Sequence, residues 1–93
     1  MIDPSAYPHL ARFFRGYLHE DFVAEHGSAP KALAAFRADL SPADRAALDT
    51  ECTHMGEALQ RVPFAEIRRL IGEGFRSAWN PAARAEVMAL LRG

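Results

Sequence analysis

The sequence predicts an all-α protein, built from about five short helices in an irregular or orthogonal bundle. The chain is rich in Ala, Leu, Arg and Glu, which favour helix, and contains little Val, Ile or Thr. No stretch shows the sustained apolar–polar alternation of a half-buried strand. Proline, glycine and serine residues divide the chain into short segments with apolar stripes. Because 93 residues is the size of one domain, we expect residues 1–93 to form a single helical domain.

The first helix is predicted from apolar residues that recur at helical spacing. Pro8 lies near its first turn, where the missing N–H of proline costs little. We expect this helix to end near His19, and Asp21 to cap a following turn that begins at Phe22. The apolar residues of this stripe share one helical face: Leu10, Phe13, Phe14, Tyr17 and Leu18.

Two serines mark the starts of the next two helices. Ser28 is a predicted cap after the break at Gly27, and the helix that follows carries Leu33, Phe36 and Leu40. Ser41 is a favourable N-cap, Pro42 suits the first helical position, and Asp44 complements the positive end of the helix dipole. The third helix has the clearest apolar stripe: Leu48, Cys52, Met55, Leu59 and Val62.

The last third of the chain predicts two more helices and a connection. Pro63 opens a fourth helix that carries Phe64, Ile67 and Ile71 and ends near Gly72 or Gly74. Phe75 and Trp79 lie in the connection, where we expect them to fill the core. Asn80-Pro81 repeats the pattern of a cap followed by proline and predicts the start of a fifth helix. Its apolar face consists of Val87, Leu90 and Leu91.

Composition and charge narrow the function classes. The net charge is −1, which does not indicate a nucleic-acid or membrane partner, and no segment is apolar enough to span a bilayer. A secretory signal is not visible and Cys52 is the single cysteine, so we expect a cytoplasmic protein. The charge is uneven, however. Residues 1–60 hold nine acidic and five basic side chains, whereas residues 61–93 hold six arginines and three glutamates.

A catalytic or metal centre is not predicted. On a continuous helix, His19 and His26 would lie roughly 10 Å apart along the axis, too far to share one zinc ion. Cys52 lies on an apolar stripe and is interpreted as a buried thiol, and His54 is on a different face from it. Helix caps and turns account for the serines at 5, 28, 41 and 77. We therefore expect no enzyme activity and no cofactor.

The arginines after residue 60 leave one alternative open. Arg61 and Arg68 are seven residues apart, as are Arg69 and Arg76, so each pair would align if the helix were continuous. The alternative is a small helical nucleic-acid-binding regulator. Against it, a helix-turn-helix protein normally shows a stronger basic excess in its recognition helix.

Two motifs near the N-terminus carry a family resemblance. They are Tyr7-Pro8-His9-Leu10 and Gly16-Tyr17-Leu18-His19-Glu20-Asp21-Phe22, with Phe14 between them. Together they resemble the start of one family of immunity proteins from bacterial contact-dependent growth inhibition systems. That family typically shows Tyr/Phe-Pro-x-Leu, an aromatic-rich helix, and Tyr-x-His-Gln-Asp followed by Trp or Phe. The segment 32–36 also suits the family's second helix. This chain has Glu20 where glutamine is usual, and its structural motif is Tyr17, His19, Asp21 and Phe22.

The resemblance implies a binding protein rather than an enzyme. Its partner would be the toxin domain that a neighbouring cell delivers, and it would neutralise that domain in the cytoplasm by covering the active site or the substrate surface. Many such toxins are nucleases with basic clefts, which an acidic surface would complement. A short helical chain of this kind is also a candidate for homodimer formation. The acidic residues that we expect to contact the toxin are Glu20, Glu25, Asp44, Asp49 and Glu57.

Overall fold

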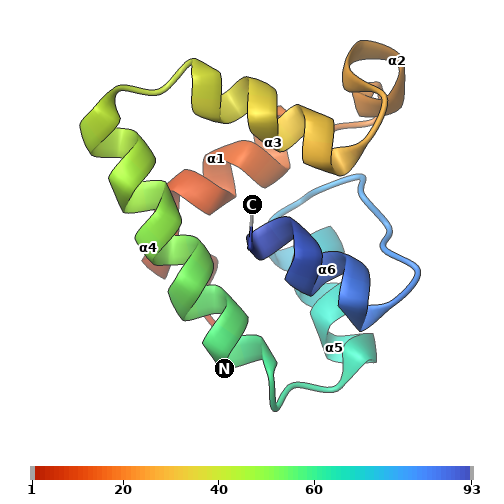
Figure 1. Cartoon of the computed structure of the whole chain (residues 1–93). Coiled ribbons are helices and arrows are strands. Elements are labelled where there is room, and N and C mark those ends of the chain that lie inside the picture. The colour runs from red at the N-terminus through yellow and green to blue at the C-terminus, as the bar shows by residue number, and fades with distance from the viewer. Residues whose placement is uncertain (1, 93) are drawn as a thin grey trace.

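The computed structural model describes residues 2–92 and confirms the all-α prediction (Figure 1). Within those residues the chain forms six α-helices and no strand. One helix more than expected is present because the turn after Asp21 is a short helix in its own right. The α-helices are α1 (Pro8–Gly16), α2 (Phe22–His26), α3 (Ala29–Ala38), α4 (Pro42–Leu59), α5 (Phe64–Arg69) and α6 (Arg84–Leu91). Two other short helical segments are the 3-10 helix η1 (Pro4–Ala6) and the π-helix η2 (Leu70–Gly74).

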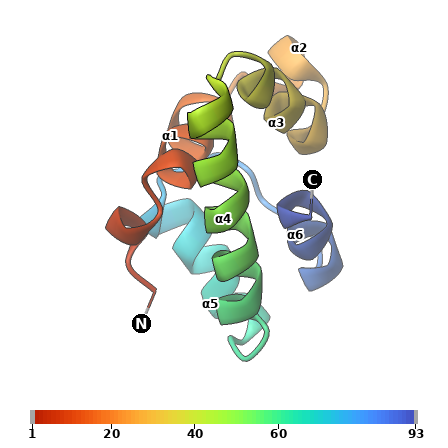
Figure 2. The same cartoon turned by 60° about the vertical axis from the view of Figure 1, so that its left-hand side comes forward.

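The helices cross at unequal angles rather than running side by side. In Figure 1, α4 forms one flank of the molecule, with α1 packed against it and α3 extending away from its start. The helices α5 and α6 lie on the other side of the core, and α2 occupies an outer corner beyond α3. Figure 2 shows the same arrangement from another direction, with α2 again at the edge of the molecule. This is the irregular bundle that the short, unequal apolar stripes predict.

The serine caps are confirmed at α3 and α4. The Oγ of Ser28 accepts the backbone N–H of Lys31 at 3.3 Å, and the Oγ of Ser41 accepts that of Asp44 at 3.1 Å. The helix α2 ends at Gly27, whose φ of +87° is the left-handed conformation that glycine adopts without strain. Local sequence signals therefore set the bounds of the elements around residues 27–44.

The predicted start of the last helix is wrong by about one turn. α6 begins at Arg84 rather than at the Asn80-Pro81 pair. The side chain of Asn80 does not cap a helix, because its Oδ1 accepts two hydrogen bonds from Arg68, at 3.0 Å and 2.7 Å. Pro81 is buried in the connection instead. At the helix start, the carboxylate of Glu86 accepts the backbone N–H of Ala82.

The core is formed mainly by the predicted apolar stripes. Phe13 is fully buried at its centre and lies 5.6 Å from Phe36, measured between ring centroids. Phe14 packs on the two aromatic residues of the connection, at 4.9 Å from Phe75 and 6.4 Å from Trp79. The expected role of these two residues in filling the core is confirmed, because Phe75 is buried and Trp79 packs against the cluster.

Hydrogen bonds between distant segments close the bundle. The carbonyl oxygen of Leu18 accepts two hydrogen bonds, one from the backbone N–H of Ala78 at 2.7 Å and one from the hydroxyl of Ser77 at 3.0 Å. The guanidinium of Arg84 donates to the carbonyl of Leu59 at 2.7 Å and to that of Val62 at 2.5 Å. The end of α4 is thus held by a side chain from α6. Across residues 2–92, none of the helices combines the length and apolar character that a membrane crossing needs.

Candidate functional site

The motif 16–22 forms the link between α1 and α2. Tyr17 follows the last residue of α1 and is fixed against α3, because its hydroxyl donates to Oδ2 of Asp39 at 2.9 Å. That hydrogen bond raises the pKa of Tyr17, with burial and the charge of Asp39 acting in the same direction. The Tyr17 ring stacks on the imidazole of His26, at 5.6 Å between centroids and 17° between planes. Tyr17 therefore anchors α2 to the body of the protein.

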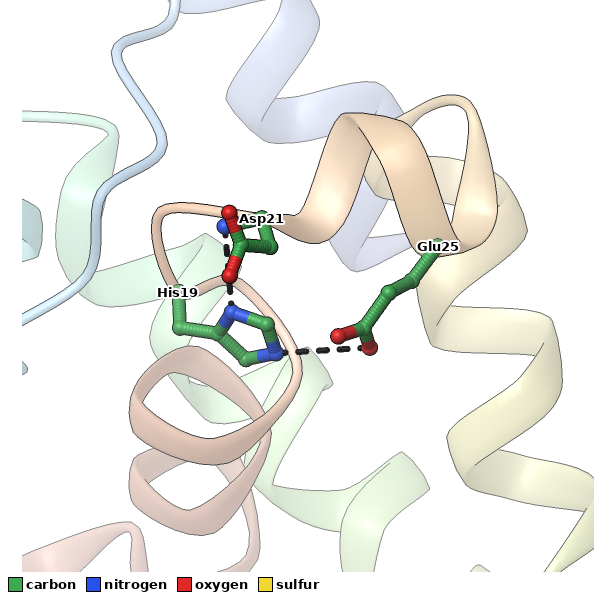
Figure 3. A group of neighbouring side chains, drawn as sticks. All are labelled: His19, Asp21 and Glu25. Atoms are coloured by element: carbon green, nitrogen blue, oxygen red, sulfur yellow. Dashed lines mark hydrogen bonds and ion pairs between the residues drawn. The ribbon is translucent and has the colours of Figure 1, made fainter.

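His19, Asp21 and Glu25 lie close together beside the first turns of α2 (Figure 3), and His26 ends the same helix. The backbone N–H of Asp21 donates to Nδ1 of His19 at 3.1 Å, and Nε2 of the same ring lies 3.4 Å from Oε2 of Glu25. Nε2 of His26 lies 3.8 Å from that same Glu25 oxygen. The link between α1 and α2 turns back on itself, and so brings together side chains that a continuous helix would separate.

Asp21 has the predicted position but not the predicted hydrogen bond. It is the N-cap residue of α2, yet its side chain accepts no backbone N–H from the first turn. The carboxylate is exposed. The φ of −96° and ψ of 11° differ from the extended conformation in which an aspartate normally caps a helix, which explains the missing bond.

Residues 19–26 form an exposed acidic surface, which we call the acidic segment. Glu20, Asp21 and Glu25 are all exposed, and the sequence of this segment contains no lysine or arginine. Val23, in the same segment, has 61% of its surface exposed. The acidic segment therefore presents three carboxylates and one large apolar side chain to solvent.

The other three predicted contacts lie on α4, away from the acidic segment. Asp44 is 3.4 Å from Nε2 of His9, and Asp49 forms an ion pair with Arg37. Glu57 is exposed near the opposite end of α4. In Figures 1 and 2, α3 stands between α2 and α4. Of the five residues, Glu20 and Glu25 therefore lie together on the acidic segment, while the α4 carboxylates lie elsewhere.

A buried network at the start of α1 was missed by the sequence analysis. Oε1 of Glu51 accepts the backbone N–H groups of His9 and Leu10 at 2.9 and 3.0 Å. Oε2 lies 2.5 Å from Nδ1 of His9. The hydrogen bond to Glu51 raises the pKa of His9, Asp44 adds to the effect, and burial opposes it. One signal was present: Glu51 lies three residues after Leu48, on the buried side of its helix.

The environments of Cys52, Arg68 and Arg76 do not indicate a reactive or nucleic-acid-binding site. Cys52 is buried as expected, and burial raises the pKa of its thiol to about 11, so it stays in the unreactive thiol form. Arg68 is held by Asn80, and Arg76 lies beyond the helical turns with a φ of +56°. The helical continuity that would align Arg69 with Arg76 is therefore not present.

Comparison with known proteins adds a family match. The model of a family described as CdiI immunity protein matches residues 6–85. The match includes the acidic segment and continues into the first turn of α6, well beyond the N-terminal motifs that first indicated the resemblance. No curated protein and no solved structure matches the chain.

Proposed function

We propose that this chain, because it belongs to the CdiI immunity protein family, binds and neutralises a toxin domain in the cytoplasm of the cell that makes it. It would do so as a stoichiometric binding protein, by covering the active site or the substrate surface of the toxin. The family match supports the immunity function. We further infer that the toxin is a nuclease and that it docks on the acidic segment. Both inferences depend on the charge of that segment.

The observation that supports these inferences is the exposed negative charge of residues 19–26. Glu20, Asp21, Glu25 and Val23 are all exposed, and the segment contains no lysine or arginine. A nuclease must bind a polyanion, so its substrate surface is basic. An acidic segment of this kind complements such a surface, and Val23 adds an exposed apolar side chain that a partner can cover.

The acidic segment is also well placed for docking. It lies at an outer corner of the molecule (Figure 1), so a partner can approach it without displacing the core helices. Tyr17 and Asp39 hold it against α3, which limits the ordering cost of binding. Opposite charges on two partners accelerate their association, and this acceleration falls as salt screens the charges.

The test uses the toxin domain encoded beside this chain and two double variants with the same change of net charge. We expect Glu20→Lys with Glu25→Lys to slow association at least about tenfold at low salt, because attraction becomes repulsion. The matched control is Glu66→Lys with Glu73→Lys, which changes exposed carboxylates in the basic part of the chain. We expect a change of less than about threefold there. Association rates at two salt concentrations, together with survival of cells that produce the toxin, are the measurements.

The outcomes distinguish an incorrect function from an incorrect docking surface. If the unmodified chain neither binds the toxin domain nor protects cells, the proposed immunity function is wrong for this toxin. If it binds and protects but both double variants behave alike, the docking surface lies outside the acidic segment. Circular dichroism of each variant checks that the fold is retained.

A further inference from the structure

Three side chains of the acidic segment offer metal-binding atoms to the same small volume. One ligand atom each from His19, Asp21 and Glu25 lies within 4.8 Å of the other two (Figure 3). An imidazole with two carboxylates is a donor set that zinc accepts, whereas calcium and magnesium prefer oxygen ligands alone. We propose that these three residues bind one divalent ion of the zinc type. This inference does not depend on the proposed toxin binding.

The distance between the two best-placed ligand atoms fits a tetrahedral ion. Nε2 of His19 and Oε2 of Glu25 are 3.4 Å apart. Two ligands that lie about 2.0–2.1 Å from a zinc ion at the tetrahedral angle are separated by about 3.4 Å. An ion can therefore sit between these atoms with little movement of either side chain. The remaining tetrahedral position would be filled by water, because the cluster is open to solvent.

The fold removes the objection that the sequence raises against a metal site here. That objection assumed one continuous helix through His19 and His26. The structure ends α1 at Gly16 and starts α2 at Phe22, so the intervening turn directs His19 toward Glu25 on the next helix. His26 reaches the same Glu25 oxygen at 3.8 Å from the other side. Two imidazoles thus approach one carboxylate oxygen, an arrangement that a cluster of acidic residues alone does not provide.

Ion binding would change one hydrogen bond in a way that can be observed. Nδ1 of His19 accepts the backbone N–H of Asp21, and Nε2 of the same ring faces Glu25. An imidazole that binds an ion through Nε2 carries its N–H at Nδ1, which then no longer accepts a hydrogen bond. The Asp21 N–H loses its acceptor, and the peptide turns so that the Asp21 carboxylate can reach the ion. The amide of Asp21 therefore reports the event directly.

The test is a titration of the untagged full chain with zinc chloride, followed by calorimetry and by two-dimensional NMR of the backbone amides. We expect saturable binding of one ion per chain and a large shift of the Asp21 amide and its neighbours in residues 19–26. We expect magnesium chloride at the same concentrations to produce neither effect, because magnesium prefers an all-oxygen site.

Substitutions identify the ligands. We expect His19→Ala and Glu25→Gln each to weaken zinc binding at least about tenfold, and Asp21→Asn to weaken it less. The matched control is His54→Ala, which removes an exposed histidine of α4 far along the chain from the cluster. Thermal unfolding of each variant shows whether it is folded. The proposal is overturned if the unmodified chain shows no saturable binding, or if His19→Ala binds zinc as well as His54→Ala does.

Discussion

Glu51 does for α1 what a serine does for α3 and α4. Tyr7 occupies the N-cap position of α1 but its side chain makes no capping hydrogen bond, so the first N–H groups of that helix need another partner. The carboxylate of Glu51 supplies it, although it comes from another helix and is separated from His9 by 42 residues. The ring of His9 also bonds to this carboxylate. The buried side chain of Glu51 therefore serves as the acceptor for backbone N–H groups of α1 and for the imidazole of His9.

We expect Glu51→Ala to lower the free energy of unfolding by about 3 kcal/mol. The truncation leaves two backbone N–H groups of α1 and the ring of His9 without an acceptor in a largely dry environment. Urea unfolding followed by circular dichroism measures the change. Glu57→Ala on the same helix removes an exposed carboxylate and should cost less than about 0.5 kcal/mol. Equal losses in the two variants would show that the network does not stabilise α1.

His9 should make the stability of the protein fall as the pH rises above about 6.5. The hydrogen bond to Glu51 raises the pKa of His9 above 6.5, so the folded state keeps this proton after the unfolded state has lost it. The stabilisation is complete below about pH 6.5 and disappears as the pH rises through the raised pKa of the folded state. Urea unfolding between about pH 6 and 8.5 should show this decline. His9→Gln should reduce it, and a decline that is as large in His9→Gln as in the unmodified chain would contradict this origin.

At the scale of the helices, local sequence signals predict some boundaries and fail at others for identifiable reasons. Ser28 and Ser41 each bond to a backbone group three residues away, so the pattern itself contains the interaction. Asn80 carries the same signal, but Arg68 takes its side-chain oxygen. That competition depends on how α5 packs against the connection. A boundary is predictable from sequence when its cap is local, and unpredictable when a distant residue competes for it.

Two glycines should respond to alanine in opposite directions. Gly56 lies inside α4, and a Cβ built there meets nothing within 4 Å, so Gly56→Ala should raise the free energy of unfolding by about 1 kcal/mol. Gly27 has a φ of +87°, which a Cβ disfavours, so Gly27→Ala should lower it by about 1 kcal/mol. Thermal unfolding of both variants provides the comparison. Stabilisation by Gly27→Ala would mean that the end of α2 adopts another conformation in solution.

At the scale of the whole molecule, the sequence predicts the family and the fold class better than it predicts the site. The motif around His19 and Asp21 is contiguous, so it can be recognised without a structure. The five acidic residues expected to contact a partner form no such unit. Their positions depend on the turn after α1 and on the placement of α3 between α2 and α4. Neither feature follows from helical periodicity, since both arise from contacts between distant segments.

The hydrogen bonds at both ends of α1 join residues far apart in the sequence, and this affects how the chain folds during translation. The start of α1 needs the carboxylate of Glu51, and the turn after its end is bonded by Ser77 and Ala78. A nascent chain has neither partner while its first helix emerges, and such long-range closures form late. Translation must therefore proceed past residue 78 before α1 is secured at both ends. Prematurely terminated chains should be degraded rather than accumulate as partly active fragments.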